Sequence, residues 1–349
     1  MAKNYEQYML RCIDLARNGK GRVAPNPMVG SIIVHNDTII GEGFHEKFGG
    51  SHAEVNAINS VKDQSLLQES TLYVSLEPCS HSGKTPPCSD LLIEKKIKKV
   101  VIGSVDINSL VAGKGIEKLR RHGVDVVENV LENKCKELNK RFFTYHKYKR
   151  PFIILKWAQS RDGFIDVLRK AGSPIGPNWI SNPISRMLVH KWRSNEQAIL
   201  VGTNTVIFDN PGLDTRLWAG DSPLRMTIDK DLRIEKKAKL YDGSKPTTIF
   251  TRLDAKNSRN LEFVKIDFST NILPQILQYT FNLGIQSIIV EGGRQLLQSF
   301  IDNNLWDEAR VFYGNKDFQA GIKAPNINSA IKTEEKILDD SLIVYNNLN

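Results

Sequence analysis

The sequence from Glu77 to Cys88 reads Glu-Pro-Cys-Ser-His-Ser-Gly-Lys-Thr-Pro-Pro-Cys and contains two Pro-Cys pairs. Apolar patterning predicts a strand over 71–76 that ends just before the first pair, and helical spacing predicts a helix over 88–97 that begins at the second. Upstream, His52-Ala53-Glu54 begins a predicted helix over 52–61. Strands and helices therefore alternate around these motifs, which predicts an α/β sandwich layered around one sheet.

The same alternation extends outward to both sides of the motifs. Further strands are predicted at 29–35, 38–44, 100–105 and 124–128, and further helices at 4–18 and 114–122. A helix over 132–145 then leads to Pro151, which disfavours helix at Arg150, and a β-rich run over 152–158 follows at once. We therefore expect two domains, residues 1–148 and 149–349.

The second half also alternates between strands and helices. Strands are predicted at 198–201, 225–229, 247–251, 287–291 and 308–313, and helices near 183–194, near 273–283 and from 293. Residues 316–336 are expected to form a loop. A length of 349 residues agrees with two domains at about 150 residues each.

The composition excludes several classes of protein. With 40% apolar and 25% charged residues, the chain is neither collagen-like nor disordered, and four cysteines are too few for a disulfide scaffold. No apolar run approaches the roughly 20 residues that span a bilayer, and the first 20 residues lack the apolar core of a secretory signal. We expect a cytoplasmic protein with reduced thiols. The net charge of +9 is compatible with binding of nucleic acid, with binding of an anionic small substrate, or simply with solvated helix faces. It therefore does not distinguish between these functions.

The motifs around the two Pro-Cys pairs predict a metal site. One imidazole and two thiolates, from His52, Cys79 and Cys88, make a tetrahedral zinc set without a fourth protein ligand. Such an open position lets zinc bind a water and lower its pKa, and Glu54 can act as the base without ligating. A structural zinc site, or unrelated core cysteines, would be the alternative. The order His-x-Glu, Pro-Cys, Cys is the signature of zinc-dependent base deaminases.

Several motifs together resemble one family, the bifunctional riboflavin-biosynthesis deaminase–reductases. They are the Glu77–Cys88 segment and residues 25–30, 41–45, 156–163, 178–181, 209–216 and 290–293, all in the family's order. The resemblance implies a cytidine-deaminase-like α/β/α sandwich followed by a dihydrofolate-reductase-like α/β domain. It also implies two reactions: hydrolytic deamination of 2,5-diamino-6-ribosylamino-4(3H)-pyrimidinone 5′-phosphate, then reduction of the ribosyl side chain to ribityl with NADPH.

The resemblance also implies roles for individual residues. For the deaminase, it makes Glu54 the proton shuttle and His52, Cys79 and Cys88 the ligands of Zn²⁺. The expected pyrimidine contacts are Asn26, His45 and Lys84. The expected cofactor contacts are Ala158, Trp179, Thr205, Asp209, Lys230 and Gly293. The expected contacts to the reductase substrate are Arg193, Leu213, Arg216 and Glu291. A homo-oligomer is implied, and no nucleic-acid or membrane partner is expected.

Among the positions that depart from the family pattern, two bear on the expected ligand contacts. Pro177 stands where a substrate-binding serine is usual, so that hydroxyl contact is lost. Lys230 replaces a small hydroxyl residue, and we expect either a contact to the 2′-phosphate of NADPH or an exposed turn lysine.

Other functions remain to be separated. A tRNA or nucleoside deaminase with an accessory C-terminal domain would use the same chemistry, but it leaves residues 151–349 without a role. A zinc-stabilised nucleic-acid-binding module would have no use for Glu54.

Overall fold

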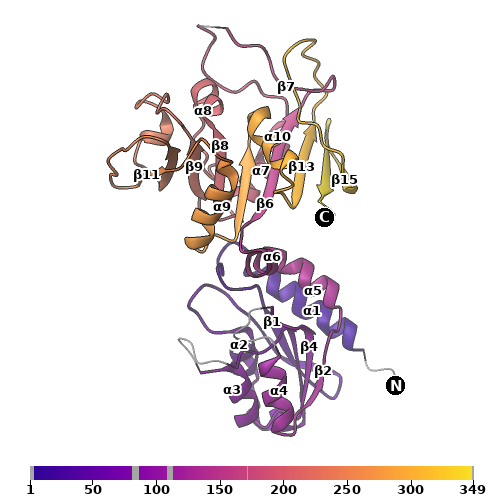
Figure 1. Ribbon diagram of the computed structural model, residues 1–349. Helices are drawn as coiled ribbons and strands as arrows, with labels where there is room; N and C mark the ends of the chain where they lie inside the picture. Colours follow the sequence, from indigo (N-terminus) through magenta and orange to yellow (C-terminus); the bar gives the residue numbers. More distant parts are fainter. Residues whose placement is uncertain (1–3, 81–85, 108–112, 171, 348–349) are drawn as a thin grey trace. The chain divides into compact units, whose positions relative to one another are not determined.

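The computed structural model describes residues 4–80, 86–107, 113–170 and 172–347 (Figure 1). The chain divides into two compact units, Met1–Lys149 and Arg150–Asn349, which are described separately. No helix in the described ranges is long and apolar enough to cross a membrane.

The described part of the N-terminal unit is built on a five-stranded sheet with the order β2-β1-β3-β4-β5. β1 pairs antiparallel with β2 and β3, whereas β3, β4 and β5 are parallel. The strands are β1 (Gly30–His35), β2 (Thr38–Phe44), β3 (Thr71–Leu76), β4 (Lys99–Ser104) and β5 (Asp125–Val127). The helices are α1 (Tyr5–Arg17), α2 (Ala53–Ser60), α3 (Cys88–Glu94), α4 (Lys114–Arg121), α5 (Glu132–Leu138) and α6 (Lys140–Tyr148), with a 3₁₀ turn at Gln64–Glu69.

Successive strand side chains build two separate cores, one on each face of this sheet. Ile33 packs in a cluster with Ala57 of α2, Leu92 of α3 and Leu119 of α4. Its neighbour Ile32 packs on the opposite face, in the cluster that α1 and α5 cover. Figure 1 shows the two sets of helices on opposite sides of the sheet. The predicted α/β/α sandwich is confirmed.

The C-terminal unit contains a nine-stranded sheet with the order β11-β10-β9-β8-β12-β6-β13-β16-β15 over its described residues. It is parallel from β11 to β13 and antiparallel where β16 and β15 complete it. The strands of this sheet are β6 (Phe152–Gln159), β8 (Ala198–Gly202), β9 (Leu224–Ile228), β10 (Thr247–Thr251), β11 (Leu261–Lys265), β12 (Ser287–Glu291), β13 (Glu308–Tyr313), β15 (Ile331–Ile337) and β16 (Asp340–Asn346). A separate pair is formed by β7 (Phe164–Asp166) and β14 (Ile322–Lys323).

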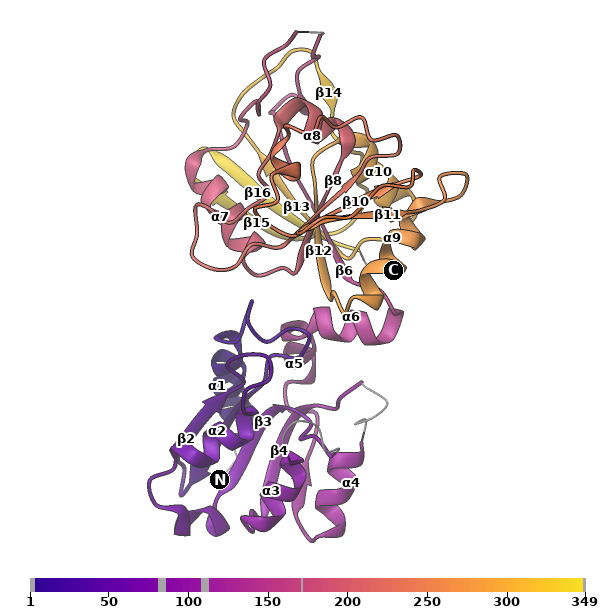
Figure 2. The ribbon, with the colours of Figure 1, turned by 90° about the vertical axis from the view of Figure 1, so that its left-hand side faces the viewer.

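Helices cover both faces of this second sheet. The helices are α7 (Pro183–Arg193), α8 (Thr203–Asp209), α9 (Ile272–Asn282) and α10 (Arg294–Asp302), and a 3₁₀ turn spans Lys239–Tyr241. α9 and α10 pack with Leu155 and Val290 in the main core, while α7 packs on the face that carries Phe312. Figure 2 shows α7 on one side of the sheet and α9 with α10 on the other. The predicted dihydrofolate-reductase-like α/β class is confirmed.

Several local predictions were wrong or incomplete. The expected loop over 316–336 contains β14 and most of β15, and β15 is exposed almost throughout, so its sequence lacks the apolar alternation that marks a strand. The expected helix over 132–145 is two helices that meet at Asn139. The amide of Asn139 binds both the N–H and the C=O of Met28, which holds this residue away from helical geometry. The short α8 and the strands β7, β11 and β16 were not predicted.

Candidate functional site

The three residues predicted to bind zinc converge in the N-terminal unit. His52 caps α2, Cys79 follows β3, and Cys88 is the first residue of α3. One ligand atom from each lies within 4.8 Å of the others, and this is the single such cluster among the described residues. His52 Nδ1 lies 3.2 Å from Cys88 Sγ and 3.5 Å from Cys79 Sγ. One imidazole nitrogen and two sulfurs at this spacing fit a tetrahedral zinc ion with one open position.

The electrostatics of the cluster suit a cation and a proton acceptor. Hydrogen bonding from the Cys88 thiol lowers the pKa of Cys79, so that thiol is readily ionised. Glu54 lies in the first turn of α2 and is 3% exposed. Burial raises the pKa of its carboxyl to about 7, where it can both accept and return a proton at neutral pH.

Two of the three expected pyrimidine contacts lie beside this cluster. The His45 ring contacts the His52 ring edge-on at 5.7 Å between centroids. His45 Nδ1 donates to Ser51 O at 2.9 Å, so its Nε2 accepts from Asn26 Nδ2 at 3.1 Å. Burial lowers the pKa of His45, which keeps this imidazole neutral. The third contact, Lys84, lies outside the described residues.

In the C-terminal unit, three of the four expected substrate residues gather around the end of β12. Glu291 accepts two hydrogen bonds from Arg193, at 3.1 and 2.8 Å, and both side chains are buried. Arg193 also donates to Asp214 O at 3.2 Å, and the Asp214 carboxylate pairs with Arg216 at 2.6 Å. Leu213 precedes Asp214, but its side chain packs in a hydrophobic cluster. Any contact from Leu213 to a substrate would therefore be made by its backbone.

Lys156 belongs to the same cluster and was not singled out by the sequence. Its Nζ lies 3.6 Å from Glu291 Oε2. Burial lowers the pKa of Lys156. Burial would raise the pKa of Glu291, but the charges of Arg193 and Lys156 outweigh it and hold that pKa at about 2. The available signal was a lysine inside an otherwise apolar strand, since β6 is buried on either side of it.

A backbone cradle lies next to this charged cluster, at the ends of β8 and β12. Gly292 and Gly293 have φ of 68° and 59° and lead directly into α10. A Cβ on Gly292 would lie 2.9 Å from two side-chain atoms of Thr205, so only glycine allows this close approach. Backbone N–H groups at a helix start can bind a phosphate. The expected cofactor contacts Thr205 and Gly293 are therefore brought together.

The other expected cofactor contacts are more dispersed. Ala158 lies on β6, two residues beyond Lys156. Asp209 ends α8 and pairs with Arg169 at 2.7 Å. Trp179 is 47% exposed, with the Arg186 guanidinium 4.4 Å from its ring centre. An exposed indole of this kind could stack on a flat ring.

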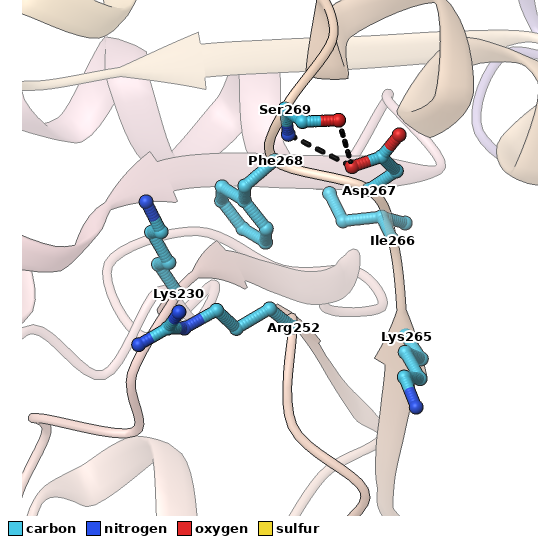
Figure 3. Close-up of a pocket in the computed structure, with 7 residues that line it drawn as sticks. All are labelled: Lys230, Arg252, Lys265, Ile266, Asp267, Phe268 and Ser269. Carbon is cyan, nitrogen blue, oxygen red and sulfur yellow. Dashed lines mark hydrogen bonds between the residues drawn. The ribbon is translucent and has the colours of Figure 1, made fainter.

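Lys230 lines a cavity of about 570 Å³ at the carboxyl ends of β9, β10 and β11 (Figure 3). Its Nζ lies 5.7 Å from the Phe268 ring centre. The side chain of Arg252 reaches toward the same end of the cavity, whereas Lys265 points away from the other two cations. Sequence reasoning missed Arg252 and Phe268, because they come from separate segments that only the sheet order brings together.

The sites define a class of protein: a two-domain enzyme with a zinc-dependent deaminase unit and a second α/β unit built on a mixed sheet. Residues 2–104 match the family model of the cytidine and deoxycytidylate deaminase zinc-binding region, and residues 151–316 match that of the RibD C-terminal domain. The chain belongs to the RibD family, the bifunctional deaminase–reductases of riboflavin biosynthesis.

Individual relatives match this chain across both domains. The riboflavin biosynthesis protein RibD of Aquifex aeolicus is 36% identical, over 97% of each chain. That of Bacillus amyloliquefaciens is 38% identical, over 93% of this chain and 88% of the relative. A solved deaminase/reductase of Thermotoga maritima is 38% identical and superposes with a TM-score of 0.88 over 98% of each chain. A tRNA deaminase with an accessory domain is not favoured, because the second half matches a reductase domain.

Proposed function

We propose that the N-terminal unit hydrolyses the 2-amino group of 2,5-diamino-6-ribosylamino-4(3H)-pyrimidinone 5′-phosphate, and that the C-terminal unit then reduces the ribosyl chain with NADPH. The observation that carries this proposal is the convergence of His52, Cys79 and Cys88 beside the buried Glu54. It is supported by the solved Thermotoga maritima protein, which is described as diaminohydroxyphosphoribosylaminopyrimidine deaminase/5-amino-6-(5-phosphoribosylamino)uracil reductase.

In the deamination, a zinc ion held by His52, Cys79 and Cys88 would supply a polarised, readily deprotonated water. Glu54 takes one proton from this water and passes it to the ring nitrogen, and then takes the second proton from the resulting C2 hydroxyl and passes it to the leaving amine. The water oxygen bonds to C2, the C2–N bond breaks, and ammonia leaves. The Asn26 amide nitrogen donates to His45, and its carbonyl oxygen is the group that would accept from an amino group of the pyrimidine.

In the reduction, a nicotinamide cofactor held near Thr205 and Gly293 would supply a hydride to C1′ of the substrate. The C1′–O4′ bond breaks, and O4′ gains a proton. Lys156 is the candidate donor of that proton, because burial lowers its pKa and favours release. Arg193 and Arg216 offer guanidinium groups that suit the substrate phosphate. Glu291 pairs with both Arg193 and Lys156 and offsets part of their positive charge, which lowers the cost of burying them.

The proposal as a whole is tested by one coupled assay. The purified protein is incubated with the diamino-pyrimidinone nucleotide while ammonia release and NADPH absorbance are followed. We expect NADPH oxidation only after deamination. Deamination without any NADPH oxidation would overturn the reductase half of the proposal. The absence of both ammonia release and NADPH oxidation would overturn both halves.

We further propose that Lys230, with help from Arg252, recognises the 2′-phosphate of NADPH. Both cations line the cavity of Figure 3, with the apolar Phe268 ring beside them. Arg252 is paired with Asp231 at 2.6 Å, so its charge is partly neutralised and Lys230 carries more of the effect. A charge-assisted hydrogen bond to phosphate contributes roughly 1.5–3 kcal/mol.

Lys230→Ala is therefore expected to raise KM for NADPH about ten-fold, since about 1.4 kcal/mol corresponds to one decade. KM for NADH should stay nearly unchanged, and the NADPH effect should shrink at high salt. The matched control is Lys265→Ala, because that ammonium pairs with Asp254 and points away from Lys230. Equal weakening toward NADPH and NADH would show that Lys230 does not read the 2′-phosphate.

We also propose that the two domains fold independently, with the boundary near Lys149. Arg150 is anchored within the C-terminal unit, by two hydrogen bonds to Asp307 at 2.6 and 2.9 Å. Asp307 also accepts from the Ile153 N–H at 2.7 Å, so the first strand of the unit is secured by its own residues.

A fragment that begins at Lys149 should accordingly fold and oxidise NADPH with the deaminated substrate. Circular dichroism and a thermal transition measure its folding. The same fragment with Arg150→Ala should be less stable but still folded, which separates the anchor from the fold. An insoluble fragment, beside a soluble full-length chain, would mean that the domains depend on each other.

A further inference from the structure

Glu77 is a buried carboxylate two residues before Cys79, and the mechanism above gives it no role. It is 4% exposed. Its two oxygens accept hydrogen bonds from backbone N–H groups of four residues that are 29 to 39 positions away in the sequence. The donors are Asp106 (3.2 Å), Gly113 (3.0 Å), Gly115 (2.9 Å) and Ile116 (3.3 Å).

These donors belong to two elements on one side of the zinc cluster. Asp106 lies just beyond β4, and the other three form the start of α4. The first N–H groups of a helix have no partner within the helix, and a carboxylate placed there is stabilised by the helix dipole. The Glu77 N–H in turn donates to Ser104 O at 3.0 Å. One residue therefore ties the end of β4 and the start of α4 to the end of β3.

The turn that follows Glu77 is packed against α4. A Cβ on Gly115 would lie 2.1 Å from the carbonyl oxygen of Pro78, so the helix start touches the backbone directly before Cys79. On its other side this turn is bonded to α3. The Ser89 N–H donates to Cys79 O at 3.1 Å, and the Cys88 N–H donates to Cys79 Sγ at 3.2 Å. Cys79 thus lies between two helix starts, and Glu77 secures the one that carries no zinc ligand.

We propose that Glu77 is a positioning residue of the zinc centre: its carboxylate clamps α4 to the Pro78-Cys79 turn and thereby sets where Cys79 Sγ lies relative to His52 and Cys88. The inference rests on the zinc site proposed above. For this contact, both carboxylate oxygens of Glu77 must accept hydrogen bonds. In Glu77→Gln an NH₂ group faces backbone N–H groups, and those contacts become repulsive without any change in side-chain size.

The first test is metal binding by full-length Glu77→Gln. Partners outside the ligand set hold ligands in place, and their loss typically costs 10–100-fold in metal affinity. We expect zinc to pass to a chelator about ten-fold faster than from the wild type, and the thiolate-to-cobalt absorption of the Co²⁺-substituted protein to change. Reduction of the deaminated substrate should be unaffected, which reports that the rest of the chain is intact.

Two further variants separate positioning from general destabilisation. Gly115→Ala leaves Glu77 in place but pushes α4 from Pro78, so it should accelerate zinc release as well. Asp63→Asn removes another carboxylate that binds a backbone N–H, that of Ser65, at a 3₁₀ turn away from the metal ligands. It should leave zinc release and the cobalt spectrum unchanged.

Two outcomes would overturn the inference directly. Wild-type zinc release and an unchanged cobalt spectrum in folded Glu77→Gln would overturn it, as would equal acceleration by Asp63→Asn. If Glu77→Gln does not fold, Glu77→Asp, which keeps the charge but reaches less far, replaces it. Loss of the folded N-terminal unit in both variants would show a role in folding rather than in positioning. A wild-type chain that retains no zinc would instead refute the proposed deaminase site.

Discussion

Glu54→Gln is expected to lower the rate of deamination by roughly 10²–10⁴-fold, the usual contribution of a positioned acid–base group. The glutamine amide cannot take a proton from the attacking water or return it to the leaving amine. The residue is buried beside the cluster and is not needed as a ligand, because His52, Cys79 and Cys88 already supply three donors. Ammonia release from the diamino-pyrimidinone nucleotide measures the effect.

Two controls identify the step that is lost. Metal analysis should still find one zinc per chain in Glu54→Gln, and the deaminated substrate should still be reduced at the wild-type rate. Glu42→Gln removes a carboxylate that pairs with Arg11 away from the site, and it should leave deamination intact. Loss of zinc from Glu54→Gln would contradict the assignment of Glu54 as a proton shuttle that does not bind the metal.

Lys156→Met is expected to have the second large effect, a fall of roughly 10²–10⁴-fold in the reductase kcat. The substitution keeps the length and apolar character of the stem but removes the ammonium. Glu291 keeps its two hydrogen bonds to Arg193, so no buried charge is left without a partner. NADPH oxidation with deaminated substrate measures the rate, and ammonia release from the first substrate should not change.

A comparison within the same cluster separates chemistry from charge balance. Lys156→Arg keeps a positive charge beside Glu291, but a guanidinium does not release its proton as an ammonium group can. If Lys156 donates the proton, Lys156→Arg should be nearly as slow as Lys156→Met. Near-wild-type activity of Lys156→Arg would show that the positive charge alone is required.

The N-terminal site was largely accessible from the sequence because its signals are local. His52 and Glu54 are two residues apart, and each of the three zinc-binding candidates lies at the end of an element whose pattern is readable. The assembled sandwich therefore fixes the positions of these three residues, and their ligand atoms lie within 4.8 Å of one another. Most strands of the two sheets were equally readable, since burial imposes an apolar pattern on them, whereas β11, β15 and β16 were not predicted.

Tertiary structure alone decided the contacts between residues that are distant in the sequence. Lys156 and Glu291 meet because β6 and β12 are neighbours in the sheet, where Lys156 is directly opposite Glu291. Lys230 and Arg252 share a cavity because β9 and β10 run parallel, side by side. Glu77 finds three of its four donors at a helix start nearly 40 residues away and the fourth, Asp106, just beyond β4. Local patterns specify the type and boundaries of an element, but strand order depends on the packing of the whole core, so residue pairs across strands emerge only when the sheet is assembled.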